Sequence, residues 1–163
     1  MINYDLTQIR AVFFDVDGVL SCETIPQHPN GDPMRTVNIK DGYAINEMLP
    51  ANGIIPAIIT GRESQIVANR AQELHVSELY QGKHDKLDTL KKLMQKYDCS
   101  KENLAYIGDD ILDIVCMKEC ILAGCPADAC HQVKDIAQYV CTCKGCEGAV
   151  REFIEFVIDY NSK

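Results

Sequence analysis

Residues 11–19 read Ala-Val-Phe-Phe-Asp-Val-Asp-Gly-Val: four apolar residues, then two carboxylates and a glycine. The run Ala11–Phe14 is typical of a buried strand, because a strand covered on both faces is continuously apolar. Acids at the carboxyl end of such a strand lie where ligands bind in open α/β sheets. If the chain stays extended after the strand, the side chains of Asp15 and Asp17 point to the same face. Gly18 then allows the backbone to turn sharply away. Two like charges held this close call for a cation or a proton between them.

Short apolar runs alternate with helical stretches along the rest of the chain. This alternation predicts an α/β fold with a parallel sheet covered by helices on both faces. In residues Lys86–Tyr97 the apolar side chains recur every three or four positions, as in an amphipathic helix. Pro56 weakens one strand assignment, since proline donates no hydrogen bond to a neighbouring strand. The other expected strands are Ile54–Ile59, Leu104–Ile107, Ile121–Ala123 and one beginning at Tyr139–Val140, and the other expected helices are Glu63–Leu74 and Glu147–Tyr160.

The segment Cys22–Ile39 breaks this alternation. It contains Pro26, Pro29 and Pro33 and the dipeptide Asn30-Gly31, between residues that favour strands. Asn-Gly is the strongest short-range signal for a tight turn between two strands. The segment therefore predicts a β-hairpin that projects from the sheet after the first strand.

The composition limits the class of protein. With 163 residues, 47% of them apolar, the chain is expected to form a single domain over residues 1–163. A net charge of −8 argues against nucleic acid as a partner. No apolar run approaches the ~20 residues of a membrane span, so we expect no membrane partner and a cytosolic location. Nine cysteines without a recognisable signal peptide favour free thiols over a disulfide scaffold.

Three of these cysteines lie close together, at Cys141, Cys143 and Cys146. Their spacing would offer three thiolates to a zinc ion, but zinc sites usually close with four ligands and no fourth is evident nearby. Packing or surface thiols are therefore the favoured interpretation, and a zinc site is the alternative.

Polar side chains also follow the later strands. Thr60-Gly61-Arg62 comes after one strand and offers a hydroxyl, a backbone amide and a guanidinium, all suited to phosphate oxygens. Asp109-Asp110 comes after another, with Asp113 one helical turn on, and Lys86 begins a helix where its ammonium would face an anion. Each has a structural alternative as a helix cap, a surface charge or an acid at a helix N-terminus. Together they supply oxygen ligands for magnesium, a carboxylate nucleophile and cations for a phosphoryl group, so they predict phosphoryl transfer.

Four motifs occur in order: Asp15-Val16-Asp17-Gly18-Val19, Thr60, Lys86 and Gly108-Asp109-Asp110. They resemble the haloacid dehalogenase superfamily of phosphohydrolases over nearly the whole chain. The resemblance implies a three-layer Rossmann-like core in which Asp15 is the nucleophile that forms an aspartyl-phosphate. Asp17 would be the acid that protonates the leaving oxygen and then the base that activates water.

The same resemblance implies the remaining site residues. Mg²⁺ would be held by Asp15, the backbone carbonyl of Asp17, and Asp109, while Asp110 and Asp113 would hold the metal's waters. The groups that bind the phosphorylated substrate would be Thr60, Gly61, Arg62 and Lys86.

The spacing of the motifs indicates the subfamily. Only 45 positions separate Asp15 from Thr60, and 26 separate Thr60 from Lys86, so a hairpin and a helix, then a helix and a strand, fill these gaps without a cap domain. The chain resembles the capless 3-deoxy-D-manno-octulosonate 8-phosphate phosphatases, in which the hairpins of four subunits form a central barrel and a neighbour covers each active site. A homotetramer is expected, with Cys22–Ile39 as the matching hairpin. The motifs that carry this resemblance are Thr36-Val37-Asn38-Ile39-Lys40-Asp41-Gly42-Tyr43, Thr60-Gly61-Arg62, Tyr80-Gln81-Gly82, Tyr106-Ile107-Gly108-Asp109-Asp110 and Gly148-Ala149-Val150-Arg151-Glu152.

One departure leaves alternatives open. Members of that family often read Gly-Gly-Arg-Gly before the last helix, whereas this chain has Gly145-Cys146-Glu147-Gly148. Glu147 resembles the related 9-phosphate phosphatases of nine-carbon keto-sugar acids, while Arg62 favours the eight-carbon substrate. A non-catalytic tetramerisation module of the same fold is the other alternative, and the retained acids argue against it. A receiver domain is disfavoured because it places its acid pair first and its lysine last.

Overall fold

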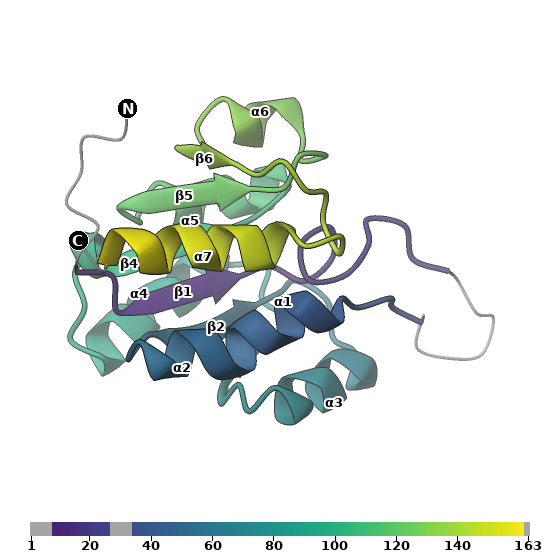
Figure 1. Ribbon diagram of the computed structural model, residues 1–163, viewed down its shortest axis with the longest axis horizontal. Coiled ribbons are helices and arrows are strands. Elements are labelled where there is room, and N and C mark those ends of the chain that lie inside the picture. Colours follow the sequence, from purple (N-terminus) through teal and green to yellow (C-terminus); the bar gives the residue numbers. More distant parts are fainter. Residues whose placement is uncertain (1–7, 27–33, 162–163) are drawn as a thin grey trace.

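The computed structural model describes residues 8–26 and 34–161. Its described residues form one parallel sheet with the strand order β3-β2-β1-β4-β5-β6 (Figure 1). The α/β fold expected from the alternating pattern is confirmed. The strands are β1 (Ala11–Phe14), β2 (Ile55–Ile59), β3 (Glu78–Tyr80), β4 (Leu104–Ile107), β5 (Leu122–Cys125) and β6 (Tyr139–Val140).

Helices cover both faces of the sheet because successive side chains of each strand point to opposite sides. In β1, Val12 and Phe14 face one core, whereas Ala11 and Phe13 face the other. On the first face lie α1 (Ile39–Tyr43), a π-helical turn (Ala44–Met48), α2 (Leu49–Ala51), α3 (Gln65–Glu73) and α7 (Ala149–Asn161). On the second lie α4 (Lys86–Lys96), α5 (Ile114–Met117) and α6 (His131–Lys134).

The strand order reverses between β1 and β4. From β1 the chain proceeds outward to β2 and β3, and after returning through β4 it proceeds the other way to β5 and β6. The last residues of β1 and β4, Phe14 and Ile107, are paired in register. The residues that follow each strand therefore emerge side by side at the topological switch point, where ligands bind in such sheets.

Pro56 lies within β2, and the hydrogen bonding of the sheet explains why proline is tolerated there. The backbone N of Ile55 donates to Arg10 O on the β1 side, so Pro56 faces the β3 side. There β3 begins only opposite Ala57, so no partner in the sheet is lost where proline lacks its N–H.

The segment Cys22–Ile39 is described only at its two ends. An isolated antiparallel bridge joins Val37, near its second end, to Ser21, the residue just before the segment. The expected turn at Asn30-Gly31 lies outside the described residues, so the hairpin stays a prediction. Its boundary at Ile39 was one residue too late, because α1 begins there and the Asn38 side chain caps it, accepting from Lys40 N at 2.8 Å.

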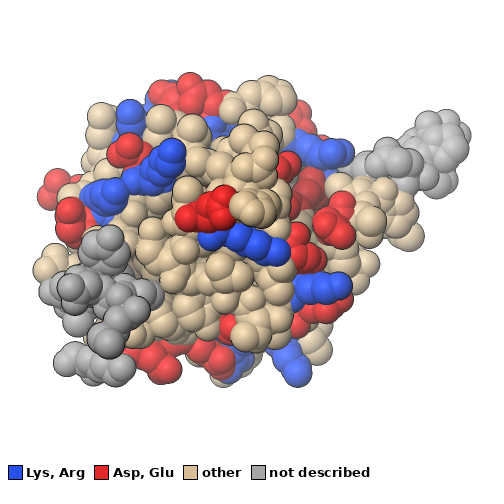
Figure 2. All heavy atoms as spheres, turned by 90° about the horizontal axis from the view of Figure 1, so that it is seen from above, with Lys and Arg blue, Asp and Glu red and all other residues tan. Residues whose placement is uncertain are grey.

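The surface carries charges of both signs. On the face seen in Figure 2, acidic and basic side chains are intermixed, and several acids lie next to basic side chains. None of the described helices has both the length and the hydrophobicity required to cross a membrane.

Candidate active site

The loop after β1 brings the first two acids to the switch point. Asp15 continues the ladder, since its backbone N donates to Ile107 O at 3.2 Å, and its side chain is buried. Gly18 has a φ of +91°, a left-handed conformation that favours glycine. A β-carbon at Gly18 would lie 2.1 Å from Asp109 Oδ2, so this glycine also allows the loop to approach β4 closely.

Lys86, at the start of α4, joins two buried acids. Its Nζ lies 2.8 Å from Asp15 Oδ1 and 2.7 Å from Asp113 Oδ1. The Tyr106 hydroxyl donates to the same oxygen of Asp113 at 2.8 Å. Lys86 is therefore a buried cation held between two carboxylates, the pairing that makes burial of a charge tolerable.

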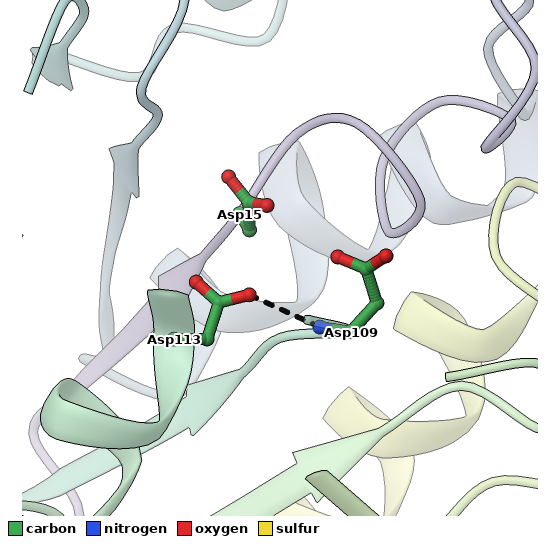
Figure 3. Close-up of side chains that lie close together, drawn as sticks. All are labelled: Asp15, Asp109 and Asp113. Atoms are coloured by element: carbon green, nitrogen blue, oxygen red, sulfur yellow. Dashed lines mark hydrogen bonds between the residues drawn. The ribbon is translucent and has the colours of Figure 1, made fainter. Parts of the chain in front are cut away.

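Asp113 organises the loop after β4. Its Oδ2 accepts from the backbone N of Asp109 at 3.1 Å (Figure 3). The same oxygen accepts from the backbone N of Asp110 at 3.3 Å. Since Oδ1 is bonded to Lys86 and Tyr106, both oxygens of this buried carboxylate have partners inside the protein. The contacts of Asp113 thus support the lysine and the Asp109 backbone.

The Asp109 carboxylate differs from that of Asp113 in its hydrogen bonding. Its Oδ1 is buried and has no hydrogen-bond partner among the described residues. Burial, and then repulsion by Asp15 and Asp113, raises its pKa to about 8. Burial and the Asp113 charge likewise raise the pKa of Asp15 to about 7, against the opposing effect of Lys86. Carboxylates that resist joint ionisation in this way are stabilised by a cation.

One carboxylate oxygen from each of Asp15, Asp109 and Asp113 lies within 4.8 Å of the others (Figure 3). Such an oxygen set suits Mg²⁺, which prefers carboxylates and water. Because both oxygens of Asp113 are already bonded, Asp15 and the unpartnered Asp109 oxygen fit a metal better than Asp113 does. The donor set and the orphaned oxygen therefore fit a divalent cation.

The groups expected to bind a phosphoryl oxygen face the same cavity. Thr60 is buried at the end of β2, and its backbone N donates to Tyr80 O at 2.9 Å, which fixes the start of the loop. The Arg62 side chain is 63% exposed, and its Nε lies 3.4 Å from Asp17 Oδ2. The cavity has a volume of about 460 Å³ and is lined by Asp15, Asp17, Glu23, Ile25, Thr60, Gly61, Arg62, Lys86, Asp109, Asp110, Leu112, Asp113, Asp128 and Cys130.

The structure thus brings together every side chain expected to act in the site. Asp110 lies at its rim, exposed, where its Oδ1 accepts from Ile111 N at 2.8 Å. The sequence reasoning missed Arg35, whose Nε lies 2.7 Å from Asp17 Oδ1. It also missed Tyr106 as a partner of Asp113, although Tyr106 stands in the quoted Tyr106-Ile107-Gly108-Asp109-Asp110 motif.

The cysteines do not contribute to this site as metal ligands. All nine are free thiols, and among the described residues the group suited to a metal contains only aspartates. The Cys141 thiol is buried against Ala149 O at 3.4 Å, and the Cys146 thiol against Thr36 O at 3.1 Å. Packing is thus the role that the structure gives these two thiols.

The loop before α7 packs on the loop after β1. A β-carbon at Gly145 would lie 1.9 Å from Gly18 O, and Cys146 N donates to Val19 O at 2.9 Å. Glu147, the departure noted in the sequence, is exposed and is not among the described residues that line the cavity.

Comparison with known proteins agrees with the fold and with the acids at its switch point. The family of haloacid dehalogenase-like hydrolases matches residues 72–154, just over half of the chain. The chain belongs to this family.

More specific relatives come from sequence and structure. A 3-deoxy-D-manno-octulosonate 8-phosphate phosphatase of Yersinia pestis is 38% identical over 150 residues, covering 92% of this chain and 80% of that protein. A crystal structure of the Yersinia pestis phosphatase has a TM-score of 0.93 at 37% identity, over 98% of this chain and 85% of that one. The Moraxella catarrhalis phosphatase, solved with a magnesium ion, a phosphate ion and a KDO molecule, has a TM-score of 0.91 at 35% identity, over 96% and 89%. Among the hydrolases, this chain is thus a member of the 3-deoxy-D-manno-octulosonate 8-phosphate phosphatase family.

Proposed function

We propose that this chain is a Mg²⁺-dependent phosphomonoesterase that hydrolyses 3-deoxy-D-manno-octulosonate 8-phosphate through an aspartyl-phosphate on Asp15. The observation that carries the proposal is the convergence of Asp15, Asp109 and Lys86 on one cavity at the switch point of the sheet. The relatives support the substrate, since the named phosphatases match this chain over most of their length.

Each side chain has a role that follows from its contacts. Lys86 holds Asp15 and offsets negative charge where the phosphoryl group would bind. Thr60 and Gly61 bind phosphoryl oxygens, and Arg62, exposed at the rim, contacts the rest of the substrate. Asp15, Asp109 and the backbone carbonyl of Asp17 would hold Mg²⁺, which when bound offsets the charge of the phosphoryl oxygens. Asp110 would hold the metal's waters. Asp113, for which the resemblance implied the same role, instead bonds Lys86, Tyr106 and the backbone of Asp109 and Asp110.

The reaction proceeds in two displacements. An oxygen of Asp15 attacks phosphorus, the bond from phosphorus to the sugar oxygen breaks, and Asp17 donates a proton to that oxygen. Asp17 then accepts a proton from a water that attacks the phosphorus. The bond to Asp15 breaks, inorganic phosphate leaves, and both aspartates return to their starting states.

A phosphate-release assay tests this proposal. Purified protein with Mg²⁺ is given the 8-phosphate, the 9-phosphate of a nine-carbon keto-sugar acid, and common hexose phosphates. We expect the highest kcat/KM for the 8-phosphate, loss of activity with a chelator, and recovery with Mg²⁺. Preference for the 9-phosphate would revise the substrate, and absence of hydrolysis for every ester would overturn the function in favour of a non-catalytic module.

A homotetramer is part of the proposal. Apolar side chains at and just beyond the described end of the 22–39 segment are exposed: Met34 by 70%, Ile39 by 81% and Tyr43 by 56%. Apolar surface of this kind is stabilised when a partner covers it. Light scattering should give the mass of four chains, and an active monomer would contradict coverage by a neighbour. We also propose a cytoplasmic location, which the nine free thiols support.

A further inference from the structure

Arg35 lies just before α1, yet its side chain reaches back to the loop after β1. It is only 3% exposed, and its Nε lies 2.7 Å from Asp17 Oδ1. Its Nη2 lies 3.4 Å from Asp17 Oδ2, and its Nη1 donates to Ser64 Oγ at 2.9 Å. Ser64 caps α3, the helix that follows the Thr60-Gly61-Arg62 loop. One buried guanidinium therefore connects Asp17 to the loop expected to bind the phosphoryl group.

These contacts make the two oxygens of Asp17 unequal. Oδ1 accepts from Arg35 Nε at 2.7 Å and from Ser21 Oγ at 3.2 Å, both of which come from well-packed side chains. Among the described residues, Oδ2 has only contacts of 3.4 Å, to Arg35 Nη2 and to Nε of the exposed Arg62. A contact of 3.4 Å is well beyond the usual range of a charged hydrogen bond. Oδ2 is thus the oxygen left available to the cavity.

We propose that Arg35 is a positioning residue that clamps Asp17 through Oδ1, so that Oδ2 exchanges protons with the leaving oxygen and the attacking water. The inference rests on the proposed function, because it assigns Arg35 a role in the proton transfer of that reaction. Arg35 is not among the described residues that line the cavity, and its contact with Oδ2, at 3.4 Å, is longer than its contact with Oδ1, at 2.7 Å. It acts by fixing the rotation of the Asp17 carboxylate, which requires the planar fork that arginine provides.

A purely structural role for Arg35 makes a different prediction. If the guanidinium only anchored the chain before α1, its loss would lower stability and slow all substrates by the same factor. If it positions the proton donor, the loss depends on how much the leaving oxygen needs a proton. A sugar alkoxide needs one, whereas p-nitrophenolate is a stable anion and needs none.

The experiment compares Arg35→Met and Arg35→Lys with wild type on the 8-phosphate and on p-nitrophenyl phosphate. The rate of the first turnover, measured by rapid mixing, reports formation of the aspartyl-phosphate alone. For Arg35→Met we expect the 8-phosphate rate to fall by about 100-fold, the scale of general-acid catalysis, while the p-nitrophenyl rate falls only slightly. Arg35→Lys, which keeps one donor and the charge, should recover part of the lost rate.

Arg70→Met is the matched control. Arg70 is also a largely buried arginine that contacts the same segment, through Nη2 to Asn38 O at 3.4 Å, but no contact joins it to Asp17. The Arg70→Met variant should have the same ratio of 8-phosphate rate to p-nitrophenyl phosphate rate as wild type. Thermal melting and Mg²⁺ titration of each variant show whether the fold and the metal affinity are retained.

The outcomes separate this inference from the function on which it rests. Equal losses on both substrates in a folded Arg35 variant would overturn the clamp while leaving the phosphatase intact. Wild type inactive on both esters would overturn the proposed function and the clamp together. If Arg35→Met does not fold, Arg35→Lys decides alone: a larger loss on the 8-phosphate supports the clamp, and an equal loss overturns it.

Discussion

Two regions of the molecule supply acids to the same cavity, but they are organised differently. In the loop after β4, Asp113 bonds two backbone N–H groups of its own turn, with Lys86 and Tyr106 completing the set. In the loop after β1, Asp17 is held by Arg35, eighteen residues further along the chain. The first region is ordered mostly by local sequence, and the second by a long-range contact. A short sequence motif therefore does not show every contact that holds the site's side chains in place.

The largest effect should follow the loss of Asp15, the group proposed to react. We expect Asp15→Asn to lower kcat by at least about 1,000-fold, as when a covalent nucleophile is removed. Its melting temperature should match or exceed that of wild type, because the pKa of Asp15 is raised to about 7 by burial and by Asp113. A steady-state assay with a melting curve checks this, and near-normal turnover would exclude Asp15 as nucleophile.

Asp113 and Asp109 sharpen the comparison, since they lie four positions apart and should differ in stability. Asp113→Asn turns an amide NH₂ toward existing donors, so we expect the free energy of unfolding to fall by about 3 kcal/mol. Asp109→Asn replaces a carboxyl that has one buried, unpartnered oxygen and a pKa raised to about 8, so metal-free stability should stay within about 1 kcal/mol or rise. Urea unfolding in chelator measures both, and equal destabilisation would break the distinction between them.

The last effect is a pH dependence of the stability of the metal-free protein. The pKa of Asp109 is about 8 in the fold and 3.8 for the unperturbed group, so the folded state binds the extra proton between these values. The free energy of unfolding should therefore fall as pH rises from about 5 to about 8, relative to Asp109→Asn. Saturating Mg²⁺ should remove this slope because it stabilises the carboxylate. If the free energies of unfolding of wild type and Asp109→Asn change with pH in parallel in chelator, this prediction is wrong.

Much of the fold could be predicted because its information is local. The runs Ala11–Phe14 and Leu104–Ile107 coincide with β1 and β4, since each is apolar throughout and ends at a charged or glycine residue. The strand expected between Thr60 and Lys86 had no readable bounds. It is β3, and it buries Glu78, whose carboxylate is bonded to Lys96 and the hydroxyls of Tyr97 and Tyr80. Two of these partners, Lys96 and Tyr97, lie 18 and 19 residues further along the chain, so the pairing leaves no periodic signal.

The residues of the candidate site also differ in whether the sequence could predict them. Its acids and Lys86 stand at strand ends or helix starts, so their types and order predicted a common edge of the sheet. Arg35 stood inside a segment interpreted only as a hairpin, and nothing near it in sequence shows that it pairs with Asp17. The two residues meet because the chain just before α1 lies next to the loop after β1, and this proximity arises only when the protein folds.

The contact between Gly145 and Gly18 joins the loop before α7 to the loop after β1. With a β-carbon at position 145 only 1.9 Å from Gly18 O, no other residue fits unless the nucleophile loop moves. A displacement of the loop before α7 would therefore be passed to Gly18, the residue that follows Asp17. A substitution at Gly145 is for that reason a hazard to turnover, although Gly145 is not among the described residues that line the cavity.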